Sequence, residues 1–200
     1  MAKETLDILR SSVLAGICIG VAGFGNLAIG GIAGPVVFTF GLSAVVLYKF
    51  KLYTGTAGFI QDKGEIGPLC LILLGNIVGC LLVGLLARVS PLPIQENAAK
   101  ILTGRLSAGI LQSGALAIGC GFIMTTAVKH ARNGSWWPLL FGVPLFIFCG
   151  FPHSIADAFY YLAAPWSMYS WSVLLLYISI VVGNFIGCNL TRLILWDRKA

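Results

Sequence analysis

A histidine interrupts a strongly apolar stretch of the chain in the segment CGFPHSIADAF, residues 149–159. Gly150 favours the end of one helix, and Pro152 prevents its continuation because proline lacks the N–H that a helix interior needs. His153 is therefore expected beside backbone donors that no helix satisfies. An imidazole next to such donors and to a helix start suits a small anion. The alternative is a buried neutral histidine that is hydrogen-bonded to a neighbour.

The residues around His153 also carry the pattern of a helix start. Ser154 is followed three residues later by Asp157, which resembles a capping box and places His153 at the N-cap boundary of the next helix. We expect Asp157 to act mainly as this cap, because an ionised carboxylate in an anion pathway would repel the anion. Its alternative role is electrostatic tuning of that pathway.

A second interruption occurs earlier in the chain, in KLYTGTAGF at residues 51–59. Thr54 and Thr56 flank Gly55, so hydroxyl groups and freed backbone amides can be aimed at a ligand or can pair with each other. Within a membrane, non-helical backbone survives only where it is buried in protein or lines a water-filled cavity. The two interruptions together predict an internal site.

The composition predicts an integral membrane protein. Only 10% of the 200 residues are Asp, Glu, Lys or Arg, against roughly 25% in soluble domains, and the mean hydropathy is +0.93. The N-terminal MAKETLDILR lacks the pattern of a signal peptide, so we expect a cytoplasmic tail before a retained helix. The polar gaps are short, which predicts a single six-helix transmembrane domain over residues 1–200 and no extramembrane domain.

Several classes of function are disfavoured. The six cysteines lie in apolar segments without metal-binding spacing, which indicates helix packing and predicts no metal site, disulfide or cofactor. The net charge of +6 contains no polybasic run, so no nucleic-acid partner is expected. The two histidines have no paired carboxylates near them in the sequence, and an enzyme is therefore not expected.

Six stretches have the length of about 20 apolar residues that a helix needs to cross the hydrocarbon core. They cover residues 11–33, 36–60, 66–87, 106–128, 137–162 and 171–195. With the N-terminus inside, eight basic residues lie on the inner side and three on the outer side: Lys3, Arg10, Lys63, Lys129, Arg132, Arg192, Arg198 and Lys199 against Arg88, Lys100 and Arg105. The positive-inside rule then predicts both termini in the cytoplasm and a chain in the cell inner (cytoplasmic) membrane.

Spans two and five contain the interruptions, and each is the middle member of a set of three. Because three is odd, the second set must be inserted upside down relative to the first, an arrangement in which interrupted helices meet near the bilayer midplane and form a substrate site. The predicted fold is all-α, with two inverted three-helix repeats in which helices 2 and 5 are broken. The repeat rests on the layout of the spans, because the two halves show no convincing residue-level identity.

The motifs at these places resemble those of the formate/nitrite transporter family, pentameric anion channels with an aquaporin-like fold in each protomer. The resemblance covers almost the whole chain and rests on three motifs: Leu52, Tyr53 and Thr54 at the first break, Gly75, Asn76 and Gly79 in span three, and residues 150–157 at the second break. It implies a homopentamer whose partners are small inorganic or organic anions and membrane lipids.

The resemblance also implies roles for individual residues. His153 is the central histidine, and Thr54 faces it. Leu52 and Phe146 are apolar constrictions on either side of this pair. Arg105 is expected at the outer entrance of span four, where it draws anions toward the passage. The remaining residues expected along the pathway are Tyr53, Thr56 and Phe151.

The chain departs from the family pattern at four positions. Gly121 and Asp157 stand where the family has asparagine, and Lys51 and Pro152 stand where it has glutamate. The missing asparagine at Gly121 is expected to leave His153 with fewer hydrogen-bond partners.

Lys49 and Lys51 add positive charge beside the first break. One role for these lysines is electrostatic tuning through stronger anion attraction. The other is that they face a protomer interface or reach toward the lipid headgroups.

The resemblance, together with these residues, implies a channel for small monovalent anions of weak acids, such as formate, nitrite, hydrosulfide, acetate or lactate. Arg105 and the lysines concentrate the anion. Because imidazole titrates near pH 6.5, His153 is expected to supply or share a proton, which makes permeation pH-dependent or proton-coupled. Two alternatives stay open. One is a membrane-embedded substrate-capture subunit of a vitamin uptake system, which needs neither broken helix. The other is a neutral-solute channel, although the Asn-Pro-Ala signature of aquaporins is absent.

Overall fold

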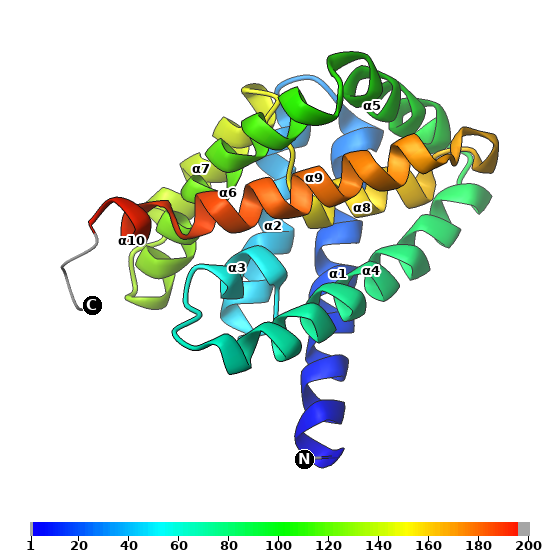
Figure 1. Cartoon of the computed structure of the whole chain (residues 1–200). Coiled ribbons are helices and arrows are strands. Elements are labelled where there is room, and N and C mark those ends of the chain that lie inside the picture. Colours follow the sequence, from blue (N-terminus) through cyan, green and yellow to red (C-terminus); the bar gives the residue numbers. More distant parts are fainter. Residues whose placement is uncertain (1, 196–200) are drawn as a thin grey trace.

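The computed structural model describes residues 2–195, and every regular element in that range is a helix (Figure 1). The elements are α1 (Ala2–Ile29), α2 (Ala33–Leu47), α3 (Tyr53–Ala57), η1 (Lys63–Glu65), α4 (Ile66–Val89), α5 (Ile94–Ala108), α6 (Ile110–Arg132), α7 (Trp137–Phe148), α8 (Ser154–Ala163), η2 (Trp166–Met168), α9 (Trp171–Cys188) and α10 (Leu190–Ile194). In this part of the chain α1, α4, α6 and α9 are long and apolar enough to cross a membrane, and α2 and α7 are shorter apolar helices. The prediction of an all-helical membrane protein is confirmed.

Two helix pairs form equivalent halves of the molecule. α1 packs along α4, and α6 packs along α9 (Figure 1). Gly16 of α1 lies so close to α4 that a Cβ would overlap the backbone of Asn76, and Gly121 of α6 has the same relation to the backbone of Asn184 in α9. The two pairs therefore make the same close contact through equivalent glycines, as the predicted repeat requires.

The break in span five is a helix C-terminus followed directly by a helix N-terminus. After the end of α7, Gly150 adopts a left-handed φ of +66°. The N–H of Phe151 donates to the carbonyl of Phe146 at 2.9 Å, which is the Schellman arrangement that ends many helices. α8 then begins at Ser154. The predicted break at Gly150 and Pro152 is confirmed.

The break in span two has the same geometry with a different residue at its turn. Lys49 follows α2 with a φ of +56° and is the one non-glycine residue with a positive φ between residues 2 and 195. The N–H of Phe50 donates to the carbonyl of Val45 at 2.9 Å. Lys49 therefore occupies the position that Gly150 holds in the other half, and it carries the backbone strain that a glycine would avoid.

Lys49→Gly is expected to raise the free energy of unfolding by about 1 kcal/mol, because the left-handed region costs a residue with a Cβ about 1–2 kcal/mol and the entropy of glycine in the unfolded chain offsets part of this. Thermal unfolding in detergent measures the change. Lys129→Gly, within the last turn of α6, is the matched control and should cost about 1 kcal/mol. A Lys49→Gly protein that is destabilised as much as the control would show that the turn carries no strain.

Two helix boundaries differ from the expectation. α1 begins at Ala2 rather than at residue 11, so the segment expected as a tail is helical. α6 begins at Ile110 rather than at residue 106, because Gly109, with a φ of +91°, separates it from α5. A chain that turns sharply at a left-handed glycine cannot keep one continuous helix across it.

The segment between spans three and four forms the amphipathic helix α5. Ile94, Ala98 and Leu102 are spaced four residues apart and are fully buried. This spacing places one apolar face against the rest of the molecule. α5 lies at the top of the view in Figure 1 and packs against α8, and it supplies side chains to the cavity described below.

Candidate functional site

The two breaks meet through one hydrogen bond between Thr54 and His153. Thr54 Oγ1 lies 3.0 Å from His153 Nε2, and both side chains are buried, with exposed fractions of 0% and 2%. Thr54 belongs to the first turn of α3, and His153 is the residue just before α8. The structure therefore brings together the two polar residues that the sequence singled out, from segments 99 positions apart.

The hydrogen bonds of His153 determine which ring nitrogen carries the proton. His153 Nδ1 accepts from the backbone N–H of Ala156 at 3.1 Å. Since a backbone N–H can only donate, Nδ1 keeps its lone pair and the neutral ring carries its proton on Nε2. Nε2 then donates to Thr54 Oγ1, and the hydroxyl hydrogen of Thr54 is left to donate elsewhere. Both ring nitrogens therefore have a partner, although Gly121 stands where the family has an asparagine.

The cap of α8 lies one residue earlier than the sequence pattern indicated. His153 itself is the N-cap, through the bond from Ala156, and Ser154 is the first helical residue. Asp157 does serve the helix start, because its Oδ2 accepts from the backbone N–H of His153 at 2.9 Å. The capping-box reading was therefore right about Asp157 and wrong about Ser154, because an imidazole nitrogen replaces the expected hydroxyl.

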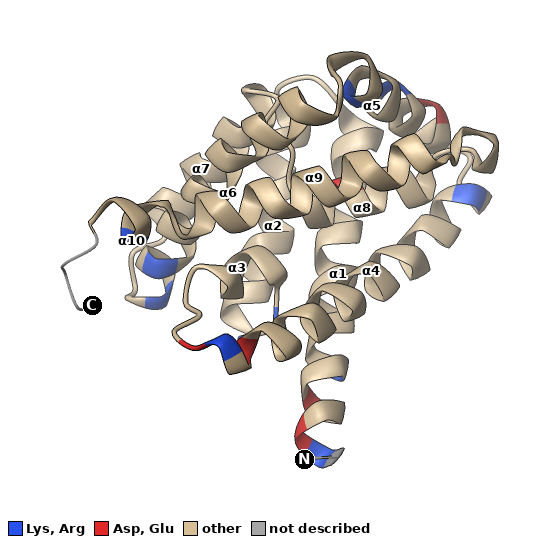
Figure 2. Ribbon diagram, in the orientation of Figure 1, with Lys and Arg blue, Asp and Glu red and all other residues tan. Residues whose placement is uncertain are grey.

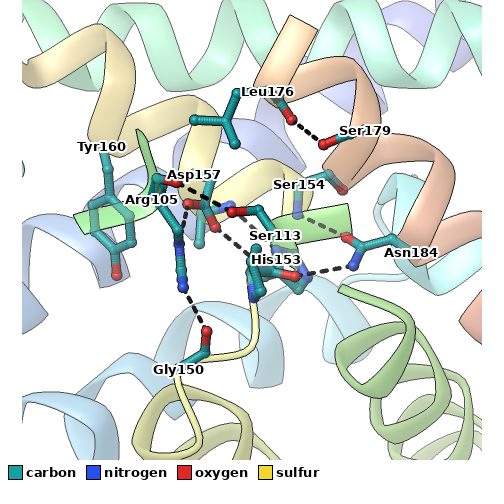
Figure 3. Close-up of polar contacts among 12 residues, drawn as sticks. Arg105, Ser113, Gly150, His153, Ser154, Asp157, Tyr160, Leu176, Ser179 and Asn184 are labelled. Atoms are coloured by element: carbon teal, nitrogen blue, oxygen red, sulfur yellow. Dashed lines mark hydrogen bonds and ion pairs between the residues drawn. The ribbon is translucent and has the colours of Figure 1, made fainter. Parts of the chain in front are cut away.

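Two buried asparagines form hydrogen bonds with backbone groups at the two breaks, and the sequence analysis does not place them in the site. Asn184 of α9 accepts from the N–H of Ser154 at 2.7 Å and donates to the carbonyls of Ala117 and Pro152 at 2.8 and 3.0 Å. Figure 3 shows its bond to Ser154 beside His153. Asn184 thus satisfies backbone groups on both sides of the second break, at a depth where water is scarce.

Asn76 of α4 repeats this pattern at the first break. Its Oδ1 accepts from the N–H of Tyr53 at 2.9 Å, and its Nδ2 donates to the carbonyls of Ser12 and Lys51 at 2.8 and 2.9 Å. The signal for both residues is in the sequence: GNIVGC at 75–80 recurs as GNFIGC at 183–188. The expectation that the two halves lack residue-level identity is therefore wrong at this motif.

The cysteine that ends each copy of the motif also contacts a break. Cys80 Sγ donates to the carbonyl of Ile155 at 3.3 Å, and Cys188 Sγ donates to that of Thr54 at 3.4 Å. These two thiols therefore act as packing residues with a weak donor. In residues 2–195 no three His, Cys, Asp or Glu side chains come together as a metal site would require.

Apolar side chains surround the Thr54 and His153 pair. The ring of Phe146 stacks on the imidazole with centroids 5.4 Å apart, and Phe38 meets Phe146 edge-on at 6.1 Å. Leu52 is 1% exposed and immediately precedes α3. Leu52 is thus close to Thr54 in the chain, Phe146 contacts His153 directly, and both are buried.

Three other predicted pathway residues have separate contacts. The Thr56 hydroxyl donates to the carbonyl of Leu52 at 2.8 Å, so it serves its own helix. The Tyr53 hydroxyl donates to the carbonyl of Val181 in α9 at 3.1 Å. Phe151 lines a cavity on the α5 side of the molecule. Of the three, Phe151 shares that cavity with His153.

This cavity has a volume of about 260 Å³ and reaches His153 from the side of α5. It is called here the outer cavity, after the side of the membrane on which the sequence predicts Arg105. Its lining residues are Asn26, Lys100, Ile101, Gly104, Arg105, Phe146, Ile147, Gly150, Phe151, His153, Ala156, Asp157 and Tyr160. Arg105 stands in the last turn of α5, which precedes α6. Its Nε lies 3.1 Å from Asp157 Oδ1, and its Nη1 donates to the carbonyl of Gly150 (Figure 3).

Arg105 remains charged in this position. Burial lowers the pKa of its guanidinium, but the charge of Asp157 and the hydrogen bond to it raise the pKa above the ordinary value. The outer cavity therefore contains a fixed positive charge with a carboxylate bound to one edge.

Lys49 and Lys51 do not line the outer cavity. Both are exposed, and the Lys51 side chain borders a separate hollow of about 460 Å³ together with Lys3, Glu4 and Asp7. The backbone N–H of Lys51 donates to Ser11 Oγ at 3.0 Å. Because Glu4 and Asp7 share this hollow, they balance the positive charges of Lys3 and Lys51 there, while Lys49 does not line it.

Figure 2 shows charged residues mainly near the ends of helices and along α5, while α2, α7 and α9 carry none.

Arginine side chains bind carbonyl groups at the C-terminal ends of α3 and α8, the helices that follow the two breaks. Arg132 donates to the carbonyl of Gly55 in α3 at 2.9 Å, and Arg192 donates to the carbonyl of Ile60, which follows that helix. Arg88 donates to the carbonyl of Leu162 in α8 at 3.0 Å. The negative end of each helix dipole is thus matched by positive charge.

Both the sequence and the fold of this chain are similar to those of known proteins. The family model described as formate/nitrite transporter matches residues 1–196. A solved structure described as a pentameric formate channel with formate bound has a TM-score of 0.81 and 20% identity, over 97% of this chain and 96% of that one. Another, described as an FNT family ion channel, has a TM-score of 0.76 and 18% identity, over 95% and 88%. No curated protein matches the chain. The chain belongs to the formate/nitrite transporter family, and it is a membrane transport protein rather than an enzyme.

Proposed function

We propose that the protein is a channel for small monovalent anions of weak acids, with formate, nitrite, hydrosulfide, acetate and lactate as the candidates. The observation that carries this proposal is the buried contact between His153 Nε2 and Thr54 Oγ1, where the two broken helices meet. Family membership supports it, as does the description of one structural neighbour as a formate channel.

The chemistry of the midpoint favours an anion. The Thr54 hydroxyl accepts from His153 and so points its own hydrogen away from that bond. His153 is the N-cap of α8, whose ten residues direct the positive end of their dipole toward the same point. The donor left for an anion at this depth is the Thr54 hydroxyl hydrogen, because the backbone N–H groups of Tyr53, His153 and Ser154 are already bonded. The buried side chains of Leu52 and Phe146 keep the passage narrow and dry on either side.

His153 couples permeation to pH through the cap of α8. A second proton on the ring would have to bind Nδ1, where the lone pair accepts from Ala156 N–H. Protonation therefore breaks the cap bond, and His153 takes up or shares a proton only when the start of α8 rearranges. In the observed geometry the neutral ring acts as a hydrogen-bond donor, and the pathway changes when the imidazole becomes charged.

The proposal extends to assembly and orientation. The structural neighbour described as pentameric supports a homopentamer, and each protomer is a single six-helix domain in contact with lipid. The excess of basic residues on the side of the termini, eight against three, supports the inner membrane with both termini in the cytoplasm. Arg105 attracts the anion from the outer side, and Lys49 and Lys51 add positive charge beside the first break, where Glu4 and Asp7 offset part of it.

Flux through the purified protein in liposomes tests the proposal. The five anions and two neutral solutes, urea and glycerol, are each supplied at two pH values, with empty liposomes as the control. We expect saturable flux of at least one small anion and none of the neutral solutes. Flux of urea or glycerol alone would indicate a neutral-solute channel. Tight binding of one ligand without flux would indicate a substrate-capture subunit.

A further inference from the structure

An ion pair spans the second break and touches both of its ends. Arg105 reaches across from α5, where its side chain is 19% exposed, and Asp157 is 1% exposed. Arg105 donates to the carbonyl of Gly150, at the end of α7, and Asp157 accepts from the N–H of His153, at the start of α8. The pair therefore connects the outer cavity directly to the backbone of the central histidine (Figure 3).

The remaining donors of Arg105 are free for a ligand. A guanidinium has five N–H donors, of which Nε points to Asp157 and one on Nη1 points to Gly150. No bond occupies Nη2 among the contacts of residues 2–195. A small oxyanion in the outer cavity can bind that edge while Asp157 keeps the other edge fixed.

Asp157 sets the charge that such an anion meets. The charged residues that line the outer cavity are Lys100, Arg105 and Asp157, which gives two positive charges and one negative charge. A conducting site must bind its ion well enough to admit it and weakly enough to release it. Without the carboxylate, the same cavity would hold anions more tightly, and divalent anions most of all.

We propose that Asp157 is a specificity-determining residue of the passage. Its carboxylate balances Arg105, so that the outer cavity holds monovalent anions weakly and releases them toward His153, and so that divalent anions gain little there. This inference rests on the proposed anion-channel function and names the residue that limits affinity and charge selectivity at the same site.

Asp157→Asn tests the proposal because it removes the charge and keeps the shape. We expect the half-saturating formate concentration to fall about tenfold and the maximal flux to fall with it, because an unbalanced cation at close range holds the anion. Oxalate, a divalent anion, should inhibit formate flux at about tenfold lower concentration than in the wild type. Glu96→Gln, an equal change of charge at an exposed position of α5, is the matched control and should change neither value.

A charge-balance experiment separates electrostatics from a merely structural role. Arg105→Gln alone leaves a buried carboxylate unpaired, so the half-saturating formate concentration should rise. The double variant Arg105→Gln with Asp157→Asn restores the net charge of the cavity and should recover flux relative to Arg105→Gln. If Asp157 were only a helix cap, the double variant would be no better than Arg105→Gln.

The possible outcomes distinguish this inference from the proposed function. Wild-type liposomes that carry no anion would overturn both. Wild-type flux with Asp157→Asn identical to Glu96→Gln, in half-saturation and in oxalate inhibition, would overturn the role of Asp157 alone. If Asp157→Asn does not assemble, as judged by size-exclusion chromatography, the comparison of the double variant with Arg105→Gln decides.

Discussion

His153→Phe is expected to reduce saturable formate flux about ten- to a hundredfold, since a hydrogen bond to a charged group contributes about 1.5–3 kcal/mol. Phenylalanine keeps the ring stacked on Phe146 but loses the bonds to Thr54 and Ala156. Stopped-flow flux in liposomes at two pH values measures the effect. The ratio of the fluxes at the two pH values should also change, because the titrating ring is gone.

The control for this variant is the other histidine. His130 is exposed near the end of α6, and His130→Phe should leave both flux and its pH dependence as in the wild type. Loss of a helix cap costs about 1 kcal/mol, so thermal unfolding must show that His153→Phe is still folded. A folded His153→Phe protein with wild-type flux at both pH values would remove His153 from the mechanism.

Asn184→Leu is expected to lower the free energy of unfolding by about 3–5 kcal/mol, because each buried polar group left without a partner costs about 1–3 kcal/mol. The substitution orphans the N–H of Ser154 and the carbonyls of Ala117 and Pro152. Thermal or denaturant unfolding of the detergent-solubilised protein measures the loss. Asn76→Leu should behave alike, since it makes the equivalent three bonds at the first break.

Asn133→Leu serves as the control for Asn184→Leu. Asn133 is exposed after α6, and its change to leucine should alter stability by less than about 0.5 kcal/mol. Equal stability of Asn184→Leu and Asn133→Leu would mean that water satisfies the freed groups at the break. The bundle would then be more hydrated at this depth than a closed membrane interior allows.

The sequence predicts the parts of the fold that depend on local composition. Low charge and long apolar runs indicate membrane helices, and Gly150 with Pro152 indicates the second break because both act on their own backbone. Local composition also predicts the first break, but it does not predict that the turn is made by Lys49. A lysine rarely adopts a left-handed φ, and nothing in its side chain indicates that this one does.

The sequence is less informative where a role depends on distant partners. Asn76 and Asn184 look like ordinary packing residues until the breaks that they bind lie beside them. Only a comparison of residues 75–80 with 183–188 signals their shared role. The sequence predicts Arg105 at the entrance of span four but not its pairing with Asp157, which arises because α5 packs against α8.

The most direct test of the central claim changes one hydroxyl at the midpoint. Thr54→Ser keeps the hydroxyl, while Thr54→Val keeps the shape of the side chain and removes it. Formate flux into liposomes is measured for the wild type and both variants at equal protein density. We predict near wild-type flux for Thr54→Ser and a loss of about tenfold or more for Thr54→Val, because the anion loses a donor at the point where it is driest. Wild-type flux in a folded Thr54→Val protein would show that anions do not cross between Thr54 and His153.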